Sequence, residues 1–303
     1  MKPLVIIKLI LSTVFIFFLA SCATSPASVS EDELYSLGKA YFDLGKYSEA
    51  EVWFQRASKF KKTEAAASYY LGRIAFLQQR YTDAARIFED LLQQDKDNII
   101  LLKAAAFSYL KALDYEKAEY LYKRVVSLLP DSKESTYGYA LVLYGLQKYS
   151  EAYSILKNVN ADLSEDRDAL LLLARIEHKL GYPEALDHYS KWLEHGEDPL
   201  VMKEYAEVAE QQSLYSRAIE AYKKIKQTNR EETAGLKKGE TDFLIGKLLL
   251  IADPADSQGL KQIELALSSG YDDKEQFEKL LSDSRLLEDQ RQALNSLFSE
   301  KNK

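Results

Sequence analysis

Apolar residues recur along most of the chain with the spacing of amphipathic helices. Over residues 31–62 this pattern predicts two short helices separated by a break at Gly45-Lys46. The apolar face of the first helix carries Leu34, Leu37 and Tyr41, and that of the second carries Ala50, Phe54 and Ala57. The segment therefore reads as a helix hairpin.

The same pattern returns every 34 residues, in four columns that keep one register over four periods. The first is a tyrosine column, Tyr47, Tyr81, Tyr115 and Tyr149, and the second an alanine column, Ala50, Ala84, Ala118 and Ala152. The third is large and apolar, Phe54, Phe88, Tyr122 and Leu156, and the fourth is small, Gly38, Gly72, Ala106 and Ala140. Such a fixed period predicts an array of hairpins. The small residues would let paired helices approach to about 8–10 Å, with the large column filling the space beside them.

Two further repeats follow with a slightly shorter period. They carry Ala174, Tyr182, Ala185, Tyr189 and Trp192 in the fifth, and Ala206, Tyr215, Ala218, Tyr222 and Ile225 in the sixth. We predict a signal peptide at 1–21, a tether at 22–30 and six hairpins at 31–226. A polar linker at 227–240 would then lead to a degenerate seventh hairpin and a helical cap at 241–303.

The repeats resemble the tetratricopeptide repeat. That family shows a large apolar residue at position 4, Leu-Gly or Leu-Ala at 7 and 8, Tyr at 11, Ala at 20 and 27, and an aromatic at 24. Matching residues of the first repeat are Leu34, Leu37, Gly38, Tyr41, Ala50, Phe54 and Ala57. The resemblance covers 31–226 and, more weakly, 241–270. It implies an all-α fold, a right-handed superhelix of antiparallel hairpins with a C-terminal helical cap.

The N-terminus has the layout of a secretory signal, with Lys2 before an apolar run over 9–20. The run ends in Leu-Ala-Ser-Cys at 19–22, which resembles the lipobox of bacterial lipoproteins. The resemblance implies cleavage before Cys22 and lipidation of Cys22, and two or three acyl chains anchor a protein durably. The alternative is an uncleaved anchor helix with a chance cysteine. Ala23, where an Asp would signal inner-membrane retention in enteric bacteria, favours the periplasmic face of the outer membrane.

Charge and motifs narrow the function classes. The formal net charge is −7, which disfavours binding to nucleic acid. The sequence has no phosphate-binding loop, no Gly-x-Ser-x-Gly motif and a single cysteine, so we expect no enzymatic activity and no cofactor. The three histidines, His178, His188 and His195, are ten and seven residues apart, so no pair lies one helical turn apart and a metal site is disfavoured.

We interpret the tyrosine column at position 17 as structural, because it recurs so regularly.

The resemblance also implies where a partner binds. In tetratricopeptide arrays the first helix of each hairpin lines a concave groove, chiefly through positions 2, 5, 9, 12 and 13. Aromatic, apolar and cationic candidates at these positions are Tyr69, Arg73, Phe76, Phe107, Leu110, Lys111, Tyr137 and Tyr144. The alternative is that some of these side chains pack against the adjacent repeat.

The sequence therefore predicts a membrane-anchored scaffold or adaptor that binds a partner protein or peptide in its groove, in cell-envelope assembly. A second hypothesis is a transport accessory lipoprotein that binds a small hydrophobic ligand or forms an oligomeric pore.

Overall fold

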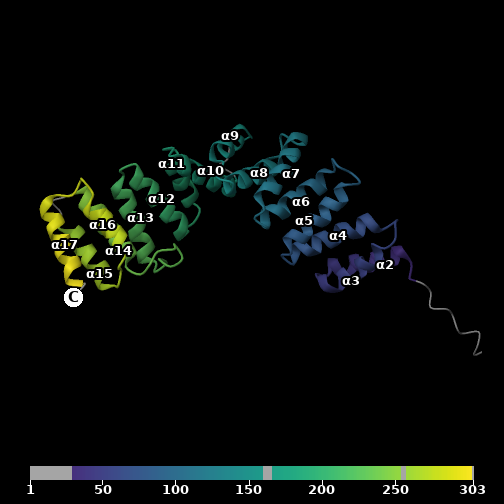
Figure 1. Cartoon of the computed structure of the whole chain (residues 1–303), viewed down its shortest axis with the longest axis horizontal. Coiled ribbons are helices and arrows are strands. Elements are labelled where there is room, and N and C mark those ends of the chain that lie inside the picture. The colour runs from purple at the N-terminus through teal and green to yellow at the C-terminus, as the bar shows by residue number, and fades with distance from the viewer. Residues whose placement is uncertain (1–28, 160–165, 254–256, 302–303) are drawn as a thin grey trace, which may run out of the picture. The chain divides into compact units, whose positions relative to one another are not determined.

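The computed structural model describes residues 29–159, 166–253 and 257–301 (Figure 1). Within these ranges the chain forms 16 helices, labelled α2 to α17, and no strand. The predicted all-α fold is confirmed. The predicted signal peptide, Cys22 and the tether up to residue 28 lie outside the described residues.

The chain divides into two compact units, one ending at Asp114 and the other beginning at Tyr115. The first contains α2 (Glu31–Asp43), α3 (Tyr47–Ala57), α4 (Glu64–Leu77), α5 (Tyr81–Leu92) and α6 (Ile99–Lys111). The second begins with α7 (Tyr115–Leu128), α8 (Lys133–Gly145), α9 (Tyr149–Val159), α10 (Arg167–Leu180), α11 (Ala185–Leu193), α12 (Pro199–Gln211) and α13 (Tyr215–Gln227). It ends with α14 (Glu240–Ala252), α15 (Gln258–Ser268), α16 (Lys274–Leu281) and α17 (Glu288–Lys301).

Small residues let the helices of a hairpin lie close together. The alanines at positions 8 and 20 are fully buried, at 0 % exposure from Ala50 to Ala218. In the first two hairpins position 8 is glycine. A Cβ atom added at Gly38 would lie 2.8 Å from the ring of Phe54, and one at Gly72 would lie 2.6 Å from the ring of Phe88. The predicted packing of a large side chain beside a small one is confirmed.

The turn that follows the first helix of each of the six repeats has one geometry. The residue at position 15 is left-handed, with φ between 59° and 72°, at Gly45, Gln79, Leu113, Gln147, Gly181 and Ser213. The next amide donates to the carbonyl five residues earlier at 2.8–3.0 Å, which is a Schellman motif. Only two of the six residues are glycine, although a left-handed conformation costs other residues about 1–2 kcal/mol.

The segment 227–240, predicted as a polar linker, contributes two apolar residues to the core. Ala234 is 0 % exposed and Leu236 is 5 % exposed, and both pack in the cluster formed by α10 to α14. Beyond this segment α14 and α15 pair closely, since a Cβ atom added at Gly246 would lie 2.9 Å from the carbonyl oxygen of Gly259. The helices α16 and α17 complete a separate cluster around Phe243.

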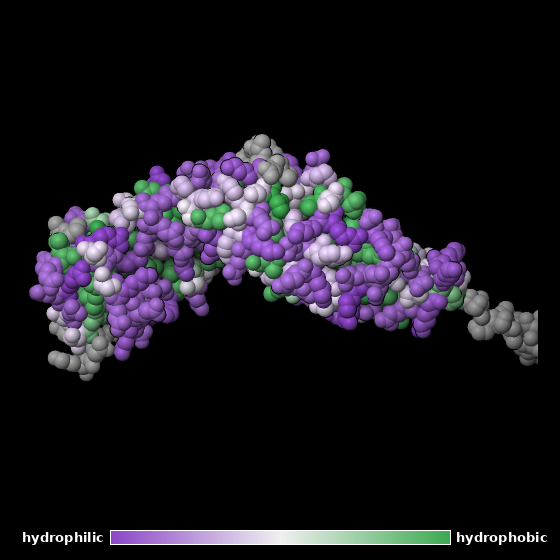
Figure 2. Space-filling model, turned by 45° about the horizontal axis from the view of Figure 1, so that its top comes forward, coloured by the Kyte–Doolittle hydropathy of each residue, from purple (hydrophilic) through white to green (hydrophobic). Residues whose placement is uncertain are grey.

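Hydrophilic side chains predominate on the face of the molecule shown in Figure 2, and hydrophobic side chains appear there as separate patches. A surface of this kind is ordinary for a helical repeat protein, because the outward faces of its helices are polar. The hydrophilic character of this face does not by itself mark a binding surface.

The turn geometry yields a stability prediction at Leu113. Its side chain is 68 % exposed, so Leu113→Gly removes little burial while relieving the left-handed strain. The gain is partly offset by the greater chain entropy of glycine. We expect the free energy of unfolding, measured by urea denaturation, to rise by about 0.5–1 kcal/mol.

The matched control is Ala112→Gly, one residue earlier, where φ is −78°. There a glycine relieves no strain and should destabilise by up to about 1 kcal/mol. Equal destabilisation by both variants would contradict a left-handed strain at Leu113.

Candidate functional site

Two helices of the first unit bring five of the eight predicted groove residues together. Tyr69, Arg73 and Phe76 on α4 are spaced i, i+4 and i+7, so they share one helix face. Phe107 and Lys111 on α6 are related in the same way. The rings of Phe76 and Phe107 stack with their centroids 5.3 Å apart, which joins the two helix faces into one surface. We call this surface the α4–α6 face.

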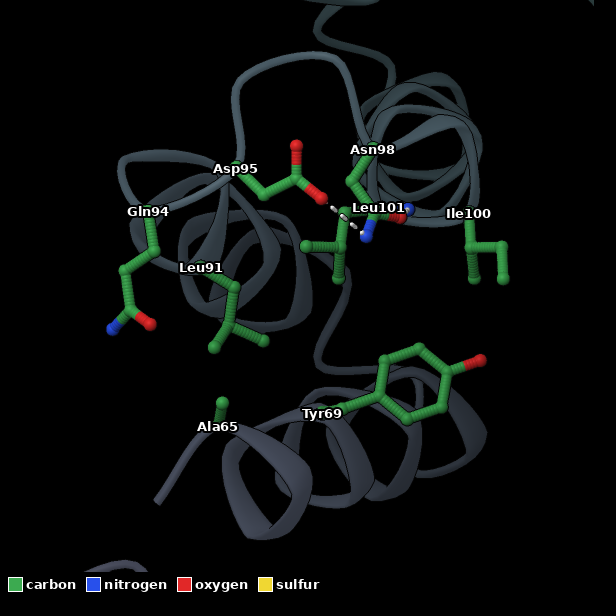
Figure 3. A pocket seen from close by; sticks show the side chains of 8 residues that line it. All are labelled: Ala65, Tyr69, Leu91, Gln94, Asp95, Asn98, Ile100 and Leu101. Carbon is green, nitrogen blue, oxygen red and sulfur yellow. Dashed lines mark hydrogen bonds between the residues drawn. The ribbon is translucent and has the colours of Figure 1, made fainter. Parts of the chain in front are cut away.

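A first hollow of about 360 Å³ lies at one end of the α4–α6 face (Figure 3). Tyr69 of α4, Leu91 of α5, and Ile100 and Leu101 of α6 line it, and Leu91 and Leu101 point into the space between the helices. Ile100 is 64 % exposed, so its aliphatic side chain is accessible to a partner. The hollow thus presents mainly apolar surface to solvent.

A second hollow, of about 190 Å³, lies further along the same two helices. Phe76 and Phe107 form its sides together with Ala104, and Phe88 of α5 contributes from the core. Phe107 is 40 % exposed. Aromatic side chains that are both rigid and accessible are typical of binding hot spots.

Two cations on the α4–α6 face rest on aromatic rings. The guanidinium carbon of Arg73 lies 4.7 Å from the ring centre of Phe42, 5.3 Å from that of Tyr70 and 5.8 Å from that of Tyr69. The ammonium nitrogen of Lys111 lies 5.4 Å from the ring centre of Phe107. Within the described ranges neither cation forms an ion pair with an acidic side chain. Both charges are therefore held in place without being neutralised.

The remaining predicted residues are placed differently. Leu110 is half-buried on α6. Tyr137 and Tyr144 lie on α8, in the second unit, and burial raises the pKa of both hydroxyls. Tyr144 lines a polar hollow of about 190 Å³ together with Arg175, whose Nε donates to Glu204 at 3.0 Å. The second unit thus neutralises its groove arginine internally.

The tyrosine column has the structural role that we inferred for it, at three positions. Ring centroids of position 12 and position 17 lie 5.4 Å apart for Phe42 and Tyr47, and 5.2 Å apart for Phe76 and Tyr81. The corresponding pair in the fourth repeat, Tyr144 and Tyr149, is 5.5 Å apart. Groove aromatics at position 12 therefore use one side of the ring for internal packing.

Cys22 lies outside the described residues, so its lipidation stays a prediction. In the part of the chain that the structure describes, no helix is long and apolar enough to cross a membrane.

One buried contact between an acid and a histidine was not predicted from the sequence. Glu177 occupies position 11, where the first and third repeats have tyrosines, and its side chain is 3 % exposed. Its carboxylate lies 2.6 Å from Nδ1 of His188. That hydrogen bond raises the pKa of His188 against the opposing effect of burial. The acid at position 11 was the signal in the sequence.

Family models match two parts of the chain. Residues 35–99 match the model described as tetratricopeptide repeat, and residues 111–192 match the model described as anaphase-promoting complex, cyclosome, subunit 3. The chain thus contains tetratricopeptide repeats and folds as an all-α solenoid. Such folds are typically protein-interaction scaffolds rather than enzymes.

Similar proteins occur in several bacteria. A tetratricopeptide repeat protein from Parabacteroides merdae ATCC 43184 matches with a TM-score of 0.55 at 22 % identity, over 82 % of this chain and 96 % of that one. MamA from Desulfovibrio magneticus RS-1 matches with a TM-score of 0.51 at 17 % identity, over 54 % and 93 %. An uncharacterized lipoprotein of Treponema pallidum (strain Nichols) is 28 % identical over 147 residues, which are 48 % of this chain and 75 % of the relative.

The pair formed by His188 and Glu177 yields a prediction for pH. Because the pKa of His188 is raised in the folded state, its contribution to stability is complete below about pH 6.5, the pKa of an unperturbed histidine. The contribution is lost as the pH rises through the raised value. We expect His188→Gln to lower the free energy of unfolding by about 1–3 kcal/mol at pH 5.5 and by less at pH 8.5.

Denaturant titrations at both pH values test this expectation. Asp187 raises the pKa of His188 and Lys191 lowers it, so these two charges act in opposite directions. The control is His195→Gln, which removes a histidine elsewhere in the chain. A loss from His188→Gln that is the same at both pH values would show that the imidazole is not charged in the fold.

Proposed function

We propose that this chain is a lipid-anchored scaffold of the bacterial cell envelope that binds a partner protein through the α4–α6 face. The lipobox-like segment ending at Cys22 supports the anchor, as does the similarity to a lipoprotein of Treponema pallidum. Ala23 after the cysteine favours the outer membrane. The tetratricopeptide repeats support a scaffold.

One observation carries the binding surface. Phe76 and Phe107 form an accessible aromatic pair that lines the second hollow, the first hollow lies further along the same two helices, and the unneutralised cations Arg73 and Lys111 lie beside the pair. Burying such a surface would release ordered water from apolar groups, which is the main source of binding free energy in protein interfaces. Aromatic side chains add to it because they bury a large area with few rotatable bonds, and Arg adds planar hydrogen bonding.

A small hydrophobic ligand is the second candidate. The first hollow, at about 360 Å³, falls within the size range of ligand pockets and has an apolar lining. Native mass spectrometry of the purified chain separates the two candidates, since a retained small molecule would favour this one.

Photocrosslinking tests the proposed surface in cells. We expect p-benzoylphenylalanine in place of Phe107 to yield a discrete covalent adduct with one protein. The control is the same amino acid in place of Val52 on α3, which is 46 % exposed against 40 % for Phe107. Equal labelling at both positions, or none at Phe107, would contradict partner binding on the α4–α6 face. Once the partner is known, Phe76→Ala should weaken binding about 30-fold.

The anchor has a separate test. Cys22→Ser removes the thiol that accepts the lipid, so we expect the variant to accumulate as an uncleaved precursor or to leave the membrane fraction. Fractionation and gel mobility of the two forms measure this. Identical behaviour of Cys22→Ser and wild type would sink the lipoprotein assignment.

A further inference from the structure

We infer that the partner segment recognised by the α4–α6 face is acidic, with two apolar side chains about 10 Å apart. The inference rests on the proposed function and specifies its partner.

The two hollows set the spacing of the apolar side chains. Tyr69 and Ile100 line the first hollow, and Phe76 and Phe107, each seven residues further along the same helix, line the second. Seven residues of α-helix span about 10 Å. A segment in the polyproline II conformation has three residues per turn and rises about 3.1 Å per residue, so apolar side chains three residues apart lie on one side, about 9 Å from each other, and can enter both hollows.

The cations set the charge of the segment. Arg73 lines the second hollow, and Lys111 lies over the ring of Phe107, which also lines it. Contact with aromatic rings holds the Arg73 guanidinium in place, so its planar set of donors is arranged before binding. A carboxylate of the partner, next to its second apolar side chain, would lie near the charges of Arg73 and Lys111. It could accept two parallel hydrogen bonds from the Arg73 guanidinium.

The second unit shows what an internally neutralised arginine looks like. Arg175 occupies the same repeat position as Arg73, and the acid that pairs with it, Glu204, stands at position 6 of the following repeat. In the first unit the residue at that position is Ala104, which lines the second hollow. Arg73 therefore lacks the internal carboxylate that Arg175 has, and a ligand could supply one.

Charge also argues against an anionic membrane surface as the occupant. The chain has a formal net charge of −7, so a membrane of the same sign would repel most of it. A short acidic segment avoids this repulsion, because it meets only the local positive charge of the α4–α6 face.

Fluorescence anisotropy with blocked, labelled 12-residue peptides tests the inference on the full-length purified chain. The reference peptide carries Leu at positions 4 and 7, Glu at 8 and 9, and Ser, Asn and Gly elsewhere. Its relatives carry Gln in place of Glu, or Ser in place of Leu. We expect the Glu peptide to bind about tenfold more tightly than the Gln peptide at low salt, and the Ser peptide to bind weakest.

Protein variants assign the preference to the two cations. The preference for Glu should vanish in Arg73→Gln/Lys111→Gln and persist in Lys59→Gln/Lys61→Gln, which makes the same change of net charge at exposed residues of the first unit. It should also fall in Ala104→Glu, which supplies an internal acid, more than in Ala104→Gln, which has the same size.

Four results would overturn the inference. If Glu and Gln peptides bind equally while Phe76→Ala weakens both, the proposed surface stands and the acidic partner is wrong. If no peptide binds but Phe107 still crosslinks to a protein, the proposed function again stands and the short segment is wrong. Binding to phosphatidylglycerol vesicles that is lost in Arg73→Gln/Lys111→Gln would assign the face to a membrane. Self-association lost in the same variant would assign it to a second copy.

Discussion

The contact between a small residue at position 8 and a large one at position 24 sets how closely the two helices of a repeat can pack. At Gly72 there is no room for even one methyl group beside the ring of Phe88, and the alanines that replace glycine in later repeats are completely buried. Such a contact lets the helix axes approach closely, where ridges of side chains favour a small set of crossing angles. The packing of the two helices also sets the directions of the other residues of the first helix. The position-5 rings of Tyr35 and Tyr69 lie next to the position-24 rings, and Arg73 and Phe76, at positions 9 and 12, line the second hollow.

The candidate surface depends on this contact directly, because one residue belongs to both. Phe88 lies against Gly72 on the inside of the hairpin and also lines the second hollow, next to Phe76 and Phe107. Its ring centre lies 5.9 Å from that of Tyr69 as well. The shape of the α4–α6 face is therefore a consequence of core packing, which gives a surface of aromatic side chains the rigidity that tight recognition requires.

The periodic core was predictable from the sequence, because a residue that must be small or large in every repeat leaves a column at a fixed spacing. The turns were harder to predict. Leu113 and Gln79 carry no mark of a left-handed backbone, since the hydrogen bonds of the Schellman motif, rather than the side chain, hold that conformation. The hollows were also missed, because they need Leu91 and Ile100, which belong to different columns. Contacts between columns depend on how neighbouring repeats pack, and a single repeat does not encode that.

Arg73 and Arg175 show how one repeat position acquires two chemistries. Both stand at position 9, and the periodic pattern treats them alike. The difference comes from their neighbours: Glu204 neutralises Arg175 at 3.0 Å, whereas Phe42, Tyr69 and Tyr70 surround Arg73 with rings. Ring faces attract a cation but leave its hydrogen-bond donors free. An arginine held in this way gains more from an incoming carboxylate than one that already has an acid, because no existing ion pair has to be broken. Recognition in a repeat protein of this kind is therefore set by the residues that surround the groove position as much as by the residue that occupies it.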